Sequence, residues 1–196
     1  MNRVETIELI KCYNDPIYFI ETYLMFGTPT YVGDKFKLYD YQKENIRKMH
    51  LRHFTSYYDG RQTGKTATAI GYIVWYACFN SDKTIGIASF RNEFTYTLLD
   101  RVYQLINGLP EFLAPKISGK NKQSVAFDNG TKILGLVTEN STRGTPLDLA
   151  YVDEADFVHN LREFMAVIMP ALSVCGGKLI MSSTLNTNSE ILKQYE

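Results

Sequence analysis

Apolar and polar positions along the chain follow two different spacings, and segments of the two kinds alternate. Helical spacing covers residues 6–25, 41–54, 65–80, 92–105 and 160–169. Short apolar runs typical of buried strands occupy residues 55–58, 84–89, 124–127, 131–137, 147–152 and 178–183. Because strands alternate with helices, the pattern predicts an α/β fold in which helices flank a mostly parallel sheet. Ligands of such sheets bind at the carboxyl ends of the strands.

Local signals refine these boundaries. Asp15 can cap a second helix with Pro16 in its first turn, so the helical segment at residues 6–25 is expected to break there. The triplet Asp128-Asn129-Gly130 is typical of a hairpin turn and predicts a β-hairpin insert before the strand at residues 147–152. Residues 27–34 are turn-rich, and the sequence contains no internal repeat. We therefore expect a single domain over residues 1–196.

The composition is that of an ordinary globular protein, with 45% hydrophobic and 21% charged residues among 196. The formal net charge is zero, so a nucleic-acid partner would have to be bound by a local patch. Cys12, Cys78 and Cys175 show neither disulfide nor metal spacing, and we expect reduced thiols. The most apolar stretch, residues 67–79, is shorter than the roughly 20 residues that span a bilayer. These features indicate a soluble intracellular protein with no membrane partner.

Gly64-Lys65-Thr66 ends a candidate phosphate-binding loop between a predicted strand and a predicted helix. In such loops backbone N–H groups and a helix N-terminus hold a polyphosphate, the lysine neutralises its β- and γ-phosphates, and the hydroxyl residue holds Mg²⁺. Asp59 stands where the strict pattern has its first glycine, but we expect Gly60 and Gly64 to shape the loop. The expected nucleotide-binding residues of the loop are Gly60, Arg61, Gln62, Thr63, Gly64, Lys65 and Thr66.

A second motif lies where the apolar run of residues 147–152 ends in Asp153 and Glu154. In P-loop ATPases an aspartate at this place helps to hold Mg²⁺, partly through water, and the adjacent glutamate activates the attacking water. Thr66 and Asp153 are therefore the predicted metal-binding residues, and Glu154 is the predicted general base. The alternative, an acidic helix N-cap, fits Asp156 better than Asp153. The predicted cofactors are ATP and Mg²⁺.

A third group of polar residues follows the strand at residues 178–183. Ser183, Thr184 and Asn186 would lie at the same edge of the sheet, within reach of the γ-phosphate or of Glu154. We interpret them as coupling residues that sense whether the phosphate is present. A Ser/Thr turn without such a role is the alternative.

Two further interactions with the nucleotide are expected. Tyr39 or Tyr41 could stack on the adenine base, and the amide of Gln42 could read its edge with one donor and one acceptor. Arg61 in the loop and Arg143 before the acidic strand are both candidates for neutralising transition-state charge. Arg61 would act within its own subunit, whereas Arg143 could also act on a neighbouring one. A surface salt bridge is the alternative for each arginine.

Taken together, five stretches resemble the ATPase domain of tailed-bacteriophage large terminases, the motors that pump DNA into proheads. They are DPIYFIETY (15–23), YDYQ (39–42), GRQTGKT (60–66), STRGTPLDLAYVDEADF (141–157) and SSTLN (182–186). The arginine and glutamine before the glycine–lysine pair are similar to the family's variant Walker A motif. At the last stretch the family more usually has threonine and proline.

The resemblance implies a RecA-like P-loop fold of the additional-strand, catalytic-glutamate type and ATP hydrolysis coupled to translocation of double-stranded DNA. It also implies a ring of subunits, with the portal of the prohead and a small terminase subunit as partners. The implied location is the host cell cytoplasm and, transiently, the prohead portal, but not the mature virion. A nuclease domain is implied for the full-length protein. We do not expect one in this chain, and we expect the ATPase fold to be truncated at its C-terminal end.

The strongest alternative is the N-terminal RecA-like domain of a superfamily 2 helicase. Residues 153–156 spell a DEAD box, Ser182-Ser183-Thr184 is similar to that family's S-A-T motif, and Gln42 is similar to its Q motif. Those helicases, however, usually carry T-G-S-G-K-T in the loop, where this chain has R-Q-T-G-K-T. The terminase interpretation is therefore preferred.

Overall fold

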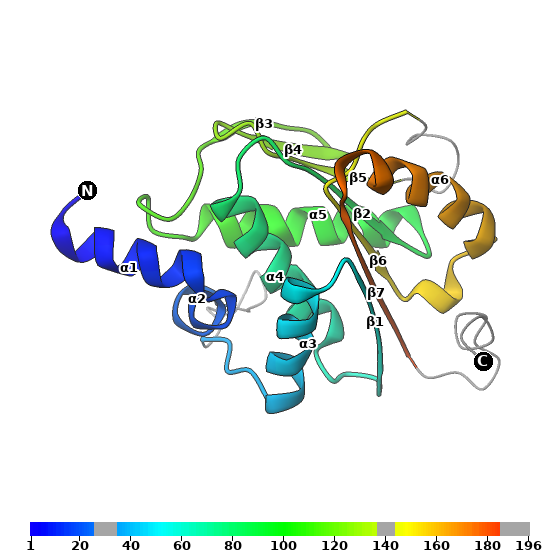
Figure 1. Cartoon of the computed structure of the whole chain (residues 1–196), viewed down its shortest axis with the longest axis horizontal. Helices are drawn as coiled ribbons and strands as arrows, with labels where there is room; N and C mark the ends of the chain where they lie inside the picture. The colour runs from blue at the N-terminus through cyan, green and yellow to red at the C-terminus, as the bar shows by residue number, and fades with distance from the viewer. Residues whose placement is uncertain (26–34, 137–143, 185–196) are drawn as a thin grey trace.

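The computed structural model describes residues 1–25, 35–136 and 144–184. Its centre is a seven-stranded sheet with the strand order β1-β7-β6-β2-β5-β4-β3 (Figure 1). The strands are β1 (Phe54–Asp59), β2 (Thr84–Ser89), β3 (Ile117–Lys120), β4 (Ser124–Phe127), β5 (Lys132–Gly135), β6 (Leu149–Asp153) and β7 (Lys178–Thr184). In this order, the four pairs from β1 through β7, β6 and β2 to β5 are parallel. The pairs β5–β4 and β4–β3 are antiparallel. The predicted mostly parallel α/β sheet with a hairpin insert is confirmed.

The position of β7 brings the predicted motifs together. This strand comes last among the described elements but lies between β1, which leads into the phosphate loop, and β6, which ends in Asp153. Asp59 at the end of β1 lies opposite Thr184 at the end of β7, and Ser89 at the end of β2 lies opposite Asp153. The carboxyl ends of these parallel strands therefore form one continuous edge, and β7 is the additional strand that the resemblance implies.

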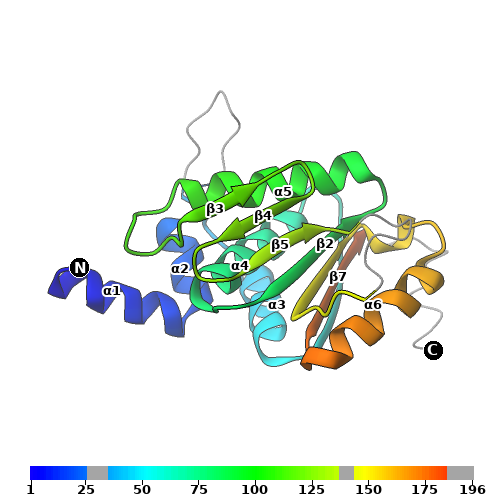
Figure 2. The same ribbon diagram turned by 90° about the horizontal axis from the view of Figure 1, so that it is seen from above.

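Helices cover both faces of the sheet. On one face lie α3 (Asp40–Leu51), α4 (Lys65–Phe79) and α5 (Asn92–Asn107), with α1 (Arg3–Asn14) and α2 (Pro16–Tyr23) beside α4 (Figure 1). α6 (Leu161–Cys175) covers the opposite face, packing Phe164, Ile168 and Leu172 against β6 and β7. In Figure 2 the β3–β5 strands extend the sheet beside α5. Two apolar cores, one on each face, thus hold the strand edge in place.

The expected break between the first two helices is present. The carboxylate of Asp15 accepts hydrogen bonds from the backbone N–H groups of Ile17 (2.8 Å) and Tyr18 (3.1 Å), and Pro16 occupies the first turn of α2. α1 begins earlier than expected because Asn2 and Glu5 form a capping box, in which each side chain accepts from the other residue's backbone N–H. The predicted turn at residues 27–34 lies outside the described residues.

Several elements differ from the sequence expectation. α3 ends at Leu51 instead of residue 54, and a short 3₁₀ helix, η1 (Ala155–Phe157), follows β6. The largest differences concern β3 and α6. β3 was not predicted because it is a largely exposed edge strand that pairs only with β4 and has little apolar character. α6 was expected to end at Met169 but continues through Pro170 to Cys175. Because Pro170 has no backbone N–H, the carbonyl of Ala166 lacks its usual helical partner. Both residues are exposed, so water can replace the missing donor. None of the described helices is long and apolar enough to cross a membrane.

Candidate active site

The phosphate loop runs from the end of β1 to the first residue of α4 and takes its shape mainly from Gly64. This glycine has φ +78°, and a Cβ there would lie 2.6 Å from Nε2 of Gln42. Gln62 also has a positive φ of 61°, a strain that functional loops often hold. At Gly60, in contrast, a Cβ would meet only Cγ2 of Thr63 at an ordinary 3.5 Å. Gly64 therefore has the expected steric role, whereas the space around Gly60 would accommodate a Cβ.

Lys65 holds its ammonium group over the loop. Nζ donates to the carbonyl oxygens of Gly60 (2.8 Å) and Asp59 (3.2 Å) and to Oγ1 of Thr184 (3.2 Å). It also lies 4.0 Å from Oε1 of Glu154, and only 5% of its side chain is exposed. Asp59, which replaces the first glycine of the strict pattern, thus contributes its backbone carbonyl, an atom that every residue type has.

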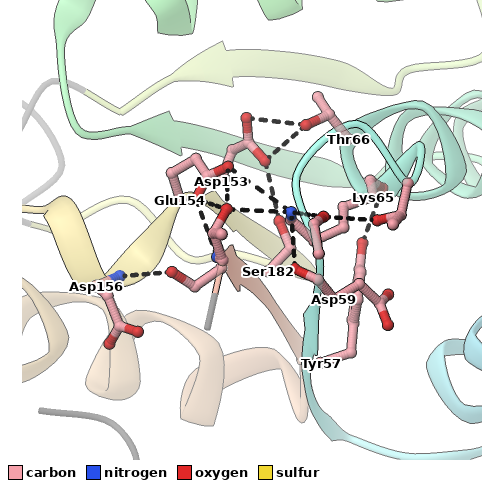
Figure 3. Close-up of polar contacts among 12 residues, drawn as sticks. Tyr57, Asp59, Lys65, Thr66, Asp153, Glu154, Asp156 and Ser182 are labelled. Atoms are coloured by element: carbon pink, nitrogen blue, oxygen red, sulfur yellow. Dashed lines mark hydrogen bonds and ion pairs between the residues drawn. The ribbon is translucent and has the colours of Figure 1, made fainter. Parts of the chain in front are cut away.

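Thr66 and Asp153, the predicted metal-binding pair, are in direct contact (Figure 3). Oγ1 of Thr66 lies 3.0 Å from Oδ1 and 3.2 Å from Oδ2 of the Asp153 carboxylate. Hydroxyl and carboxylate oxygens are the hard donors that Mg²⁺ prefers, and this ion usually takes few protein ligands beside phosphate and water. Within the described residues no cluster of three or more His, Cys, Asp or Glu could hold a metal. A hydroxyl and one carboxylate therefore fit Mg²⁺ bound together with a polyphosphate.

Glu154 is held by the end of β7. Its Oε2 accepts from the backbone N–H of Thr184 at 3.1 Å, and Oγ1 of Thr184 lies 3.1 and 3.2 Å from its two carboxylate oxygens. Glu154 has a left-handed backbone, with φ 49° and ψ 50°, which is uncommon for a residue with a side chain. Oγ of Ser183 accepts from the backbone N–H of Asp156 at 3.3 Å. The predicted coupling residues Ser183 and Thr184 thus contact the acidic strand end.

A cavity of about 650 Å³ lies above these residues, within the size range of ligand pockets. Arg61 lines it, is exposed, and forms no ion pair with any residue of the described ranges. Four of the cavity's lining residues were not among the predicted site residues. Ala67 follows the loop and Phe157 follows the acidic strand end, whereas Phe90 and Arg101 lie outside every motif. The complete lining is Arg61, Gln62, Thr63, Gly64, Lys65, Thr66, Ala67, Phe90, Arg101, Glu154, Phe157 and Thr184.

Tyr41 and Gln42, the predicted base-binding residues, contact the loop instead of lining this cavity. The hydroxyl of Tyr41 (2.8 Å) and Nε2 of Gln42 (3.0 Å) both donate to the carbonyl oxygen of Thr63. Oε1 of Gln42 accepts from the backbone N–H of Tyr39 at 2.9 Å, and the Gln42 side chain is buried. Both ends of its amide are therefore engaged within the protein, and the adenine contact stays a prediction. Arg143 and Asn186 lie outside the described residues.

Beneath the site, Tyr57 and Tyr151 place two phenol groups in the sheet, and neither was among the predicted site residues. Burial raises the pKa of both hydroxyls, which therefore stay protonated and can donate hydrogen bonds at any physiological pH. The hydroxyl of Tyr57 donates to the carbonyl oxygen of Lys65 at 3.0 Å, and that of Tyr151 donates to Oδ1 of Asp153 at 2.6 Å. The first turn of α4 and the end of β6 are thus both tied to the buried interior.

The fold and the site together define a P-loop NTPase with an additional strand between the phosphate-loop strand and the acidic strand. Residues 56–195 match the family described as terminase large subunit, T4likevirus-type, N-terminal. The chain therefore belongs to the terminase large subunit family and carries its N-terminal domain.

Solved structures share this fold. The HK97 bacteriophage large terminase matches with a TM-score of 0.75 and 18% identity over 93% of this chain and 40% of that one. The large terminase ATPase domain of Thermus phage P74-26 matches with a TM-score of 0.61 and 20% identity, over 72% of this chain and 64% of that one. This chain thus spans less than half the length of the HK97 protein.

The helicase alternative also has a counterpart of similar fold. The UvsW helicase from bacteriophage T4 matches with a TM-score of 0.63 and 14% identity, over 93% of this chain and 64% of that one. A likeness at this identity shows only that the two proteins share an architecture. The family match, which covers most of the chain, assigns it to the terminases rather than to the helicases.

Proposed function

We propose that this chain hydrolyses ATP and that the energy drives double-stranded DNA into proheads. The observation that carries the proposal is the meeting of Lys65, Thr66, Asp153 and Glu154 at the carboxyl ends of β1, β6 and β7. A phosphate-binding lysine, a metal-binding pair and a carboxylate beyond the metal are the parts that hydrolysis of a nucleoside triphosphate requires. The ATPase activity named for the P74-26 relative supports ATP as the substrate.

Each side chain has a distinct task in this proposal. Lys65 and the N–H groups at the start of α4 bind the β- and γ-phosphates. Thr66 and Asp153 hold Mg²⁺, which neutralises phosphate charge when it is bound. Glu154 lies within 4.0 Å of the lysine and takes a proton from the attacking water. Thr184, which contacts both Lys65 and Glu154, links the loss of phosphate to movement of β7.

The catalytic arginine is Arg61 or Arg143. Arg61 lines the cavity, is exposed, and is not engaged in an ion pair with any described residue, so its guanidinium is available for the phosphates. An arginine that stabilises transition-state charge contributes about 10³–10⁵ in rate. Arg143 remains the second candidate on the basis of its place before the acidic strand.

The partners and location follow from family membership. We propose that the complete protein works as a ring of subunits at the portal of the prohead, with double-stranded DNA and a small terminase subunit as further partners. It would act in the host cell cytoplasm and leave the portal before the virion matures. Nuclease activity would belong to a part of the complete protein other than residues 1–196.

Replacing Glu154 with glutamine tests the hydrolytic proposal. Glu154→Gln keeps the size of the side chain and one acceptor oxygen for Thr184, but it removes the base and its negative charge. ATP turnover should fall by about 10²–10⁴-fold while ATP binding persists. Turnover is measured by phosphate release and binding by equilibrium titration with a fluorescent ATP analogue. Glu93→Gln, an exposed change in the first turn of α5, is the matched control and should leave both values unchanged.

Undiminished turnover in Glu154→Gln would remove Glu154 from the role of base. A second assay distinguishes a packaging motor from a helicase. It uses the complete protein with proheads and linear duplex DNA. ATP-dependent protection of the DNA from added nuclease is expected. Strand separation of the duplex without packaging would favour the helicase.

A further inference from the structure

A cluster of three buried hydroxyl groups lies directly beneath Asp153, and we call Tyr57, Tyr151 and Ser182 the hydroxyl cluster. They come from three neighbouring strands, β1, β6 and β7. Tyr57 and Ser182 are partners in the β1–β7 register, and Tyr151 precedes Asp153 by two positions, so both point to the same face of β6. Figure 3 shows Tyr57 and Ser182 on the side of the site away from Thr66.

Two members of the cluster bind one oxygen of the Asp153 carboxylate. The hydroxyl of Tyr151 donates to Oδ1 at 2.6 Å, and Oγ of Ser182 donates to the same oxygen at 2.9 Å. The two hydroxyl oxygens are also 2.9 Å apart. Each hydroxyl has a single hydrogen to donate. When both hydrogens are donated to Oδ1, neither is left for a hydrogen bond between Tyr151 and Ser182. Together they fix the direction of the carboxylate from below.

The two carboxylate oxygens of Asp153 therefore differ in their number of hydrogen-bond partners. Oδ1 is within hydrogen-bond distance of Tyr151, Ser182 and Thr66, whereas Oδ2 contacts only Thr66, at 3.2 Å, among the described residues. Oδ2 thus keeps lone pairs for a further partner. The two contacts from below thus leave Oδ2 as the carboxylate oxygen that neither Tyr151 nor Ser182 binds.

Burial makes these contacts strong. Tyr151 is completely buried, and Ser182 and Asp153 are 1% and 7% exposed. Hydrogen bonds to a charged acceptor in a water-poor environment are roughly twice as strong as neutral ones and resist reorientation of the carboxylate. Outer residues that hold a metal-binding side chain by hydrogen bonds typically affect metal affinity or activity by about 10–100-fold.

We infer that Tyr151 and Ser182 are positioning residues that hold the Asp153 carboxylate so that Oδ2 is presented to Mg²⁺. The inference rests on the proposed function, because it assigns to Asp153 the metal of an ATP complex. Tyr57 completes the arrangement by holding the carbonyl of Lys65, next to the other predicted metal-binding residue, Thr66.

The structure offers a matched control for each positioning residue. Tyr72 is a fully buried tyrosine on α4 whose hydroxyl has no hydrogen-bond partner within the described residues. Ser89 is a buried serine opposite Asp153 on β2, the strand on the other side of β6, and its Oγ likewise has no partner there. Tyr72→Phe and Ser89→Ala therefore remove a buried hydroxyl without removing a hydrogen bond to Asp153.

The test compares Tyr151→Phe and Ser182→Ala with these controls in the complete protein. Mn²⁺ binding in the presence of a non-hydrolysable ATP analogue is followed by electron paramagnetic resonance, which needs no turnover. Each positioning variant should weaken Mn²⁺ binding about tenfold and raise the Mg²⁺ concentration for half-maximal ATPase by a similar factor. The KM for ATP and kcat at saturating Mg²⁺ should change by less than about threefold, since added metal compensates for a misdirected ligand. Both control variants should match the wild type.

Three outcomes would overturn the inference. Wild-type Mn²⁺ affinity in Tyr151→Phe and Ser182→Ala would show that the contacts do not orient the ligand. An equal loss in the two control variants would show a general effect of buried hydroxyls. Wild-type protein that binds no Mn²⁺ with the analogue would overturn the proposed function and this inference with it. If Tyr151→Phe does not fold, Ser182→Ala, on a separate strand, decides alone.

Discussion

Gly64 has a left-handed backbone, which residues with a Cβ adopt at an energetic cost. The side chain of Gln42, which packs against it, leaves no room for a Cβ. The glycine of the Gly-Lys-Thr triplet is therefore explained by local geometry and not by the motif alone. Asp59 illustrates the reverse case. The strict pattern has glycine at this position, but here the residue ends β1 and offers Lys65 only its carbonyl oxygen.

Substitution of Gly64 tests this explanation. Gly64→Ala should lower the free energy of unfolding by about 1–2 kcal/mol, the cost of a left-handed backbone for a residue with a side chain. Gly60→Ala is the control, because its φ is not positive and its added Cβ makes an ordinary contact. Urea unfolding should show a loss below about 0.5 kcal/mol for this variant. Equal losses for the two variants would contradict the steric explanation.

At the scale of single elements, chain-local signals set most boundaries. Asp15 and Pro16 separate α1 from α2, and Asp128-Asn129-Gly130 joins β4 to β5, as the sequence predicted. The two largest failures, at β3 and α6, have one cause. β3 is stabilised by pairing with β4, and α6 continues past Pro170 because its apolar face packs on β6 and β7. Both effects depend on residues that are distant in the sequence, and neither leaves a local signal.

The cap of α2 can be tested directly. Asp15→Ala removes the acceptor for two backbone N–H groups and should lower the free energy of unfolding by about 1 kcal/mol. Asp15→Asn should lose less, because asparagine caps helices about as well as aspartate. Chemical denaturation followed by circular dichroism measures both variants. An Asp15→Asn variant as unstable as Asp15→Ala would indicate that the negative charge matters more than the cap.

At the scale of the whole molecule, the order of strands assembles the site. Because β7 lies between β1 and β6, Thr184 reaches both Lys65 and Glu154. The apolar cores on the two faces of the sheet fix this order, so the loop, the acidic strand end, Ser183 and Thr184 share one edge. The cavity beside them is also lined by Phe90 after β2, Arg101 on α5 and Phe157 in the short 3₁₀ helix after β6.

The assembly of several chains bears on the second arginine. If Arg143 acts on a neighbouring subunit, mixing Arg143→Ala protein with Lys65→Ala protein should restore part of the ATPase activity. Some subunits with an intact Lys65 site would then face a neighbour with an intact Arg143. Phosphate release is measured under conditions where subunits exchange, and each variant mixed with itself is the control. No recovery in the mixture would favour a role of Arg143 within its own subunit.

The sequence by itself determined the class of fold, the family and the residues of the three motifs, because each depends on neighbours along the chain. Apolar spacing marks strands and helices, and the Gly-Lys-Thr and Asp-Glu groups are short and contiguous. Which predicted site residues meet, and through which atoms, could not be read in this way. Gln42 supports the loop, Phe90, Arg101 and Phe157 line the cavity, and Tyr151 and Ser182 hold Asp153. These contacts depend on strand order and register, which are set by packing across the whole sheet and carry no signature in any single segment.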